Sequence, residues 1–243
     1  MTMIISAHLE GCLLIAADNR AMVCDVETGE MLLSHDDEAK IKLWSLGAIA
    51  GTGETVFLNR IMDYFSHFQA KEQQLKQMDV IYEEIEKRLM EGVPKEMLIN
   101  NTLIFSMFDG EQSHLYSIPI EPFFKEIERK DGVKVIHPYV HEIYPWIVDV
   151  TCFNLPPDMS SLQNFQRHLR SLSSFDNEST FLEYHIQQLK KVFAVQASID
   201  PSITTSFDLY IQICATGHSI ALHIENPVLA SPFPKKLNYW DRK

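Results

Sequence analysis

The fold is decided by residues 2–21, which have the sequence TMIISAHLEGCLLIAADNRA. Two apolar runs, residues 3–7 and 12–17, lie on either side of a short break that contains Gly11. Apolar runs of this length that are separated by a glycine-containing turn predict the two strands of a β-hairpin. Asp18 and the polar residues after it follow the second strand directly, so we expect them in a turn.

Three further features of residues 21–50 predict strands. The segment 27–30 has turn-forming residues and lies between residues 21–26 and 31–34, which predicts a second hairpin. Residues 40–44 alternate between charged and apolar side chains, as a half-buried strand does. Residues 47–50 form a short apolar run of small side chains.

The hydrophobic period changes after Glu54. From there to residue 89, apolar side chains recur at the spacing of an amphipathic helix. A single helix over residues 54–91 would be about 57 Å long at about 1.5 Å per residue, which is too long for a compact domain. We therefore predict two antiparallel helices, separated by a break within the polar residues 69–74.

The C-terminal half combines further strands with one long helix. The patterns predict a hairpin over residues 102–108 and 114–118, a helix over 181–197, and a last hairpin over 208–215 and 219–224. Residues 119–160 mix short strands with loops. The order of elements predicts an α+β, four-layer αββα sandwich of two antiparallel sheets flanked by helices.

Composition limits the choice of partners and compartments. The formal net charge is −12, which argues against nucleic acid or an anionic membrane as the main partner. No segment approaches the roughly 18 apolar residues that span a bilayer, and no signal peptide is visible at the start. Four cysteines without a CxxC pair are typical of reduced thiols, so we expect a cytoplasmic protein with Cys12 and Cys214 in its core.

Four landmarks in residues 2–65 resemble those of proteasome β subunits and the related bacterial ATP-dependent peptidase, which are N-terminal nucleophile (Ntn) hydrolases. They are Thr2 near the start, the motif Ala16-Ala17-Asp18-Asn19-Arg20-Ala21, Lys40 followed by Ile41, and Gly51 between an apolar strand and a helix. The resemblance implies the Ntn-hydrolase fold. It also implies one proteasome-like domain over residues 1–226 with an atypical insertion around 119–175, followed by an irregular, proline-rich tail over 227–243.

The resemblance further implies a mechanism that these residue types suit. Removal of Met1 would free the α-amino group of Thr2, whose pKa of about 7.7–8.0 lets it act as the base for the threonine hydroxyl. Lys40 would keep that amine deprotonated and assist proton transfer, and Asp18 would hold Lys40 charged and oriented. The backbone N–H of Gly51 would stabilise the oxyanion.

The family also has a late Asp-x-x-Ser-Gly segment. Asp200 corresponds to its aspartate, but no Ser-Gly pair follows at the required position. The family's Gly-Ser-Gly turn before its third helix is also absent, and Ser174 lies near that place. Ser202 and Ser174 are therefore poor counterparts of the family's serines. The predicted catalytic set is Thr2, Asp18, Lys40, Gly51 and Asp200, with no cofactor and no metal, and we expect Arg20 to be structural.

By the same resemblance we expect a threonine peptidase or amidohydrolase that acts on peptides or unfolded proteins within a homo-oligomer or ring. An ATPase unfoldase is a possible partner, and small amides are possible substrates if no ring forms. The alternative is a catalytically inactive scaffold or interaction protein that retains Met1. The small side chain of Thr2 favours removal of Met1 and hence the enzyme.

Two weaker patterns compete with this interpretation. Residues 47–53 have the form GxxxGxG between a strand and a helix, as in a dinucleotide-binding loop, although several strands precede it. His137, His141, His218 and His223 are a possible metal-ligand set, although Pro138 interrupts the spacing of the first two.

Overall fold

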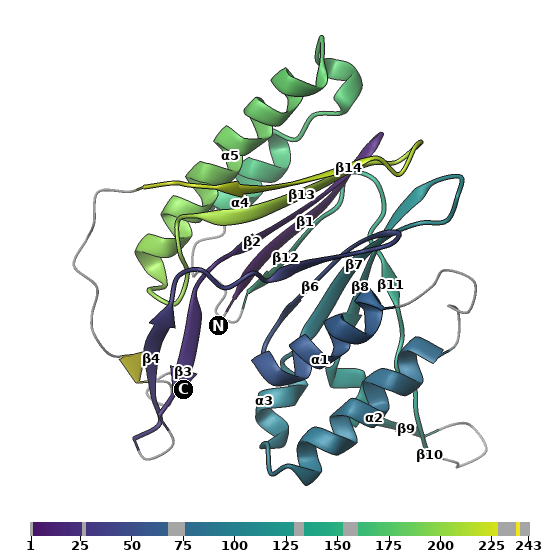
Figure 1. Cartoon of the computed structure of the whole chain (residues 1–243), viewed down its shortest axis with the longest axis vertical. Coiled ribbons are helices and arrows are strands. Elements are labelled where there is room, and N and C mark those ends of the chain that lie inside the picture. The colour runs from purple at the N-terminus through teal and green to yellow at the C-terminus, as the bar shows by residue number, and fades with distance from the viewer. Residues whose placement is uncertain are drawn as a thin grey trace.

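Two antiparallel sheets of five strands form the centre of the fold (Figure 1). The computed structural model describes residues 2–25, 28–67, 76–128, 134–152, 160–227 and 237–238. The first sheet has the strand order β12-β1-β2-β13-β14, made of Val148–Cys152, Met3–Leu9, Cys12–Asp18, Phe207–Ile213 and Ser219–Ile224. The second has the order β11-β8-β7-β6-β5, made of His141–Glu142, Ser113–Pro119, Thr102–Phe108, Gly47–Thr52 and Ile41–Trp44.

Helices cover the outer face of each sheet (Figure 1). Helices α4 (Ser160–Arg167) and α5 (Glu178–Ile199) pack on the first sheet, and α1 (Thr55–Ser66) and α2 (Lys76–Met90) pack on the second. The order of layers is therefore helix, sheet, sheet, helix. The predicted α+β sandwich is confirmed.

Three hydrophobic clusters hold these layers together, and β1 contributes to two of them. Met3 and Ile5 face α4 and α5, whereas Ile4 faces the second sheet. This alternation is the two-residue period of a strand. Because both faces are packed, all seven residues of the strand are buried, including the polar Ser6 and His8.

Helices α1 and α2 are antiparallel, as the sequence predicted. Glu54, the N-cap of α1, binds Arg88 near the end of α2, with Oε1 of the glutamate 3.0 Å from Nη2 of the arginine. The glutamate also accepts from the backbone N–H groups of Val56 and Phe57, so it closes the first turn of α1. The break predicted at residues 69–74 lies outside the described residues.

Smaller elements complete the fold. Strands β3 (Ala21–Cys24), β4 (Glu30–His35) and β15 (Leu237–Asn238) form a small sheet, and β9 (Glu126–Glu128) pairs with β10 (Lys134–Ile136). The helix α3 (Lys95–Ile99) and two 3-10 helices, Glu121–Phe124 and Leu172–Ser174, were not predicted. These elements are too short to show a hydrophobic period.

The segment 119–175 contributes to both outer and inner layers. Strand β12 pairs with β1, and Leu162 and Phe165 of α4 join the cluster on the first sheet. Most of residues 227–243 lie outside the described residues. The division into a domain over 1–226, an insertion and a tail stays a prediction.

Two expectations from composition can be compared with the structure. Cys12 and Cys214 are buried, as expected, and burial raises the pKa of these thiols to about 12 and about 11 respectively. In the described part of the chain, no helix is both long enough and apolar enough to cross a membrane.

Candidate active site

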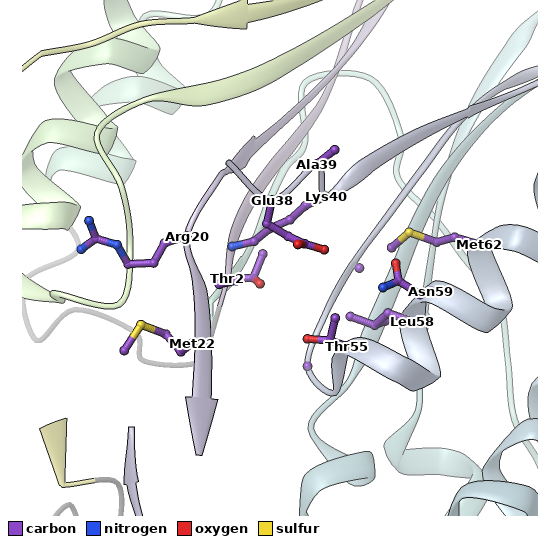
Figure 2. Close-up of a pocket in the computed structure, with 13 residues that line it drawn as sticks. Thr2, Arg20, Met22, Glu38, Ala39, Lys40, Thr55, Leu58, Asn59 and Met62 are labelled. Atoms are coloured by element: carbon purple, nitrogen blue, oxygen red, sulfur yellow. The ribbon is translucent and has the colours of Figure 1, made fainter. Parts of the chain in front are cut away.

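Three of the predicted site residues, Thr2, Lys40 and Gly51, line one pocket. The pocket lies between the start of β1, the loop before β5, the end of β6 and helix α1. Figure 2 shows Thr2 beside Lys40, facing Asn59 of α1 across the pocket. Thr2 is 6% exposed, so its side chain is held within the protein and not in a free terminus.

The register of the strands explains why Lys40 and Gly51 meet. In the β5–β6 hairpin, Ile41 lies opposite Ala50. Lys40 comes one residue before this pair and Gly51 one residue after it, so both lie at the same end of the hairpin. The antiparallel pairing thus brings together two residues that are eleven positions apart in the sequence.

Asp18 lies beneath this pocket and is bound by three donors. Its Oδ1 accepts from Lys40 Nζ at 2.9 Å and from the backbone N–H of Met3 at 2.8 Å, and its Oδ2 accepts from the backbone N–H of Arg20 at 2.9 Å. The carboxylate is fully buried. Because Met3 follows Thr2, the same aspartate holds both the lysine and the residue next to the threonine.

The environment of Lys40 changes its acidity. Burial removes water from the ammonium group and lowers the pKa of Lys40, although the carboxylates of Asp18 and Glu38 act in the opposite direction. Arg20 adds a smaller effect that also lowers this pKa. A lysine with a lowered pKa releases its proton more readily than an exposed one, which suits a group that exchanges protons with a neighbour.

Gly51 is packed too closely for a larger residue. A Cβ atom at this position would lie 2.5 Å from Leu58 Cδ2 and 3.2 Å from the carbonyl oxygen of Thr102. The glycine therefore lets β6 pass close to α1 at the edge of the pocket. Its predicted role as an oxyanion donor stays a prediction.

Asp200 does not line the pocket. It caps the end of α5, and its Oδ1 accepts from both the backbone N–H of Ser202, at 2.9 Å, and the hydroxyl of Ser202, at 2.6 Å. The next residue, Pro201, accepts a hydrogen bond from Arg20 Nη1 at 2.7 Å. Arg20 therefore links the turn at Asp18 to the residue that follows Asp200. The catalytic role of Asp200 stays a prediction.

Arg20 also lines the pocket, but its guanidinium is paired with a carboxylate. Its Nε and Nη2 bind the two carboxylate oxygens of Asp36 at 2.5 and 2.6 Å, and Figure 2 shows the side chain pointing away from α1. Such a bidentate pair fixes orientation as well as charge. Ser174, the other poor counterpart, lies in a 3-10 helix, where its hydroxyl is 3.1 Å from that of Ser171.

Sequence reasoning missed one wall of the pocket. Helix α1 contributes Thr55, Leu58, Asn59 and Met62. These residues are three or four positions apart and so share one face of the helix. That spacing was available in the sequence, but nothing local indicated that this face lies opposite Thr2.

The structure does not favour the two competing patterns. Strand β6 is antiparallel to both of its neighbours, and the Glu54 carboxylate already binds the first amides of α1. A negative charge there would repel a pyrophosphate. Within the described ranges, no three His, Cys, Asp or Glu side chains gather as metal ligands would.

Comparisons with known proteins concern the fold. No protein-family model matches the sequence, and no curated protein matches it. Among solved structures, a mutant of Anbu from Hyphomicrobium sp. strain MC1 is 17% identical, with a TM-score of 0.58 over 92% of this chain and 87% of that chain. Another Anbu structure from the same strain is 14% identical, with a TM-score of 0.55 over 91% and 87%. Anbu from Yersinia bercovieri, an ancestral beta-subunit, is 12% identical, with a TM-score of 0.55 over 93% and 88%.

These findings correct the family assignment made from sequence. The assignment to proteasome β subunits, the bacterial ATP-dependent peptidase and the Ntn-hydrolase family was wrong, because no family model matches and the similar structures reported above are Anbu proteins. The four landmarks are short motifs, and short motifs recur without common membership. What the comparisons show is the fold: this chain has an α+β fold similar to that of the proteasome-like Anbu proteins.

Proposed function

We propose that this protein hydrolyses amide bonds with Thr2 as its nucleophile after removal of Met1. The observation that supports the proposal is the arrangement of Thr2, Lys40 and Gly51 around one pocket, with Asp18 bound to Lys40 beneath it. The proposal rests on the chemistry of these side chains and not on family membership.

The reaction needs two steps. The α-amino group of Thr2 accepts the hydroxyl proton, and Oγ1 attacks the carbonyl carbon of the substrate. The C–N bond then breaks, and the amine leaves with the proton, which leaves an ester on Thr2. Water attacks the ester, releases the acid and restores the hydroxyl. Lys40 is a proton-exchange partner for the amine, because its own pKa is lowered by burial.

The other members of the set have supporting roles in this proposal. Asp18 orients Lys40 and anchors Met3. The N–H of Gly51 donates to the oxyanion, and Asp200 stabilises the turn that Arg20 joins to the site.

We infer that the substrates are peptides or unfolded proteins and that copies of the chain assemble into a homo-oligomer in the cytoplasm. The similarity to a protein described as a beta-subunit supports the assembly. The net charge of −12 disfavours nucleic acid and anionic membranes as partners. An ATPase unfoldase is a possible partner of such an assembly.

The test is the intact mass of protein made without an N-terminal tag, combined with labelling by an epoxyketone. We expect loss of Met1 and one adduct on Thr2. Thr2→Ala should abolish the adduct, and Lys40→Met should slow its formation by about 100-fold or more, the range of a single proton-transfer group.

Lys42→Met is the matched control. Lys42 lies two residues further along, is 29% exposed and pairs with the exposed Asp63, so its loss should leave labelling unchanged. Retention of Met1 with no adduct would contradict the proposal and favour an inactive scaffold. Equal slowing in the Lys40 and Lys42 variants would remove Lys40 from the mechanism.

A further inference from the structure

The lining of the candidate active site has three charged side chains, which are Arg20, Glu38 and Lys40. Each of the two cations is paired with a carboxylate: Arg20 Nε lies 2.5 Å from Asp36 Oδ1, and Lys40 Nζ lies 2.9 Å from Asp18 Oδ1. Among the described residues that line the pocket, Glu38 has the only carboxylate. Two cations and three carboxylates therefore give the site an excess of one negative charge, and Glu38 places it in the lining.

The position of Glu38 is fixed by its neighbours. Its backbone N–H donates to the carbonyl of Asn19 at 2.9 Å, and its carbonyl accepts from Asn19 Nδ2 at 3.3 Å. Its Oε2 lies 2.8 Å from His35 Nε2, and a neutral histidine ring that donates to a carboxylate leaves the negative charge in place. Figure 2 shows the carboxylate directed across the pocket toward α1. With 26% of its side chain exposed, Glu38 is accessible to a ligand that enters there.

Apolar side chains form much of the remaining wall. Met22 of β3 and Leu58 and Met62 of α1 line the same pocket. Leu58 and Met62 are 6% and 3% exposed, so they are held in place by the core behind them. Methionine and leucine pack well against methylene groups. The pocket thus combines an apolar wall with one carboxylate, which matches a side chain that has an apolar stem and a cationic end.

Glu38 lies within reach of a substrate bound to Thr2. It precedes Lys40 by two residues, which span at most about 7 Å of chain, and Lys40 lies beside Thr2 (Figure 2). Electrostatics agrees with this short separation: burial lowers the pKa of Lys40, and the carboxylate of Glu38 acts in the opposite direction. The four-carbon stem of lysine, or the similar stem of arginine, is long enough to cross such a gap.

We propose that Glu38 makes the site selective for peptides that have lysine or arginine at the residue whose carbonyl carbon Thr2 attacks. The ammonium or guanidinium group donates to the Glu38 carboxylate, while the stem packs against Met22 and Leu58. An acidic side chain is repelled at the same place, and a neutral one leaves the carboxylate without a cation. The inference rests on the proposed function and adds the substrate class.

The charge of the whole chain favours the same class of substrate. A formal net charge of −12 attracts basic peptides over distances longer than a hydrogen bond and repels acidic ones. This long-range attraction does not depend on any single residue, whereas the pairing with Glu38 is local. An experiment on selectivity therefore has to separate the two effects.

The test compares two peptide epoxyketones that differ in one side chain, which is arginine in one and its uncharged analogue citrulline in the other. The measurement is the rate constant for labelling of Thr2 by each probe. We expect the wild type to prefer arginine by roughly 10- to 100-fold, the range of a hydrogen bond to a charged group. Glu38→Gln should bring the ratio close to one. Because the ratio is taken within each variant, any effect of Glu38 on the reactivity of Lys40 cancels.

Asp37→Asn is the matched control. It removes the same charge from the neighbouring residue, whose side chain is 90% exposed, and should keep the preference for arginine. A preference that persists in the Glu38 variant, or that disappears equally in both variants, would overturn the assignment to Glu38.

Failure of this inference is distinguishable from failure of the proposed hydrolysis. A wild type that reacts equally with both probes would overturn the selectivity and leave the nucleophile standing. A wild type that reacts with neither would contradict the hydrolysis. Calorimetry on Thr2→Ala, which cannot react, then compares binding of the arginine and citrulline peptides as simple amides. Tighter binding of the arginine peptide, lost on addition of Glu38→Gln, would support the basic-side-chain site without the chemistry, and equal binding would overturn it.

Discussion

Lys40 Nζ lies 2.9 Å from Asp18 Oδ1, with only 8% of the lysine side chain and none of the aspartate side chain exposed. An ion pair this deeply buried has little net effect on stability when both partners are present, because the cost of removing water offsets the attraction. Loss of one partner is different, since it leaves a charge that is buried and uncompensated. The pair therefore links stability to the candidate site.

Asp18→Ala should lower the free energy of unfolding by about 3–5 kcal/mol, the range for breaking a buried pair. The substitution also removes the acceptor for the N–H groups of Met3 and Arg20. Denaturant unfolding measures the change. The double variant with Lys40→Met should lose less than the two single losses added together, because no unpaired charge remains. A loss for Asp18→Ala no greater than that of Lys42→Ala would contradict this account.

The pH dependence of stability should show the lowered pKa of Lys40. Its pKa in the folded protein is lowered by burial, whereas the unfolded chain has the ordinary lysine value of about 10.4. Between these two values the unfolded state binds more protons, so stability rises with pH. Below the folded value both states are protonated and the burial penalty is constant.

The measurement is the free energy of unfolding of the wild type and of Lys40→Met from neutral pH to about pH 10. Other groups titrate equally in both proteins. The difference between the two free energies of unfolding therefore reports the titration of Lys40 alone. The wild type should gain stability relative to the variant as pH rises through this interval. Parallel curves would show that burial does not lower the pKa of Lys40.

Two glycines near the pocket should differ in their tolerance of alanine. At Gly53, φ is +127° and an added Cβ would lie 1.3 Å from Asn101 Oδ1, which also accepts from the N–H of Glu54. At Gly51 the nearest atom is the flexible end of Leu58, at 2.5 Å. We expect Gly51→Ala to cost about 1–3 kcal/mol and Gly53→Ala to cost more.

Gly110→Ala separates backbone strain from crowding. Gly110 has a φ of +106° with no atom within 4 Å of an added Cβ, so only the strain of the left-handed backbone applies. Thermal unfolding of the three variants should give the order Gly110, Gly51, Gly53, from least to most destabilised. A Gly53 variant as stable as the Gly110 variant would show that Asn101 moves freely.

Sequence patterns predicted the elements that bury long or regularly spaced sets of residues. The first hairpin has two apolar runs, because both of its strands are buried throughout, and the α1–α2 pair and α5 show a period of 3.6. The pairing of β12 with β1 was not predictable in this way. Met3 and Cys152 are adjacent in the sheet but far apart in sequence, and no local pattern records such a contact.

The candidate site, too, was only partly predictable from the sequence. The resemblance named the wrong family, but Thr2, Lys40 and Gly51, which it placed in one site, line one pocket, and their catalytic roles stay predictions. It did not place Asp200, which binds Ser202 instead of lining the pocket. The helix face that includes Asn59 was also missed, because its position depends on how α1 packs over the second sheet.

Asn19 joins three segments around the site. Its backbone N–H donates to Thr204 Oγ1 at 3.0 Å, and its carbonyl accepts from the N–H of Glu38 at 2.9 Å. Its side-chain Nδ2 donates to Asp208 Oδ2 at 2.8 Å and to the carbonyl of Glu38 at 3.3 Å. Since Glu38 precedes Lys40 by two residues, Asn19 holds the lysine loop against the end of β2.

Asn19→Ala should therefore loosen the loop as well as lower stability. The substitution removes the donor to Asp208 Oδ2 and to the carbonyl of Glu38. Loss of this donor at a largely buried position should cost about 1–3 kcal/mol. Hydrogen exchange of the Glu38 amide should accelerate more than global unfolding explains, because the loop opens locally. Asn164→Ala on α4 is the control, since Asn164 is exposed and its loss should change stability by less than about 0.5 kcal/mol. Exchange at Glu38 that follows only the global change would show that the backbone bond to Asn19 alone holds the loop, and that the side chain has no part in positioning Lys40.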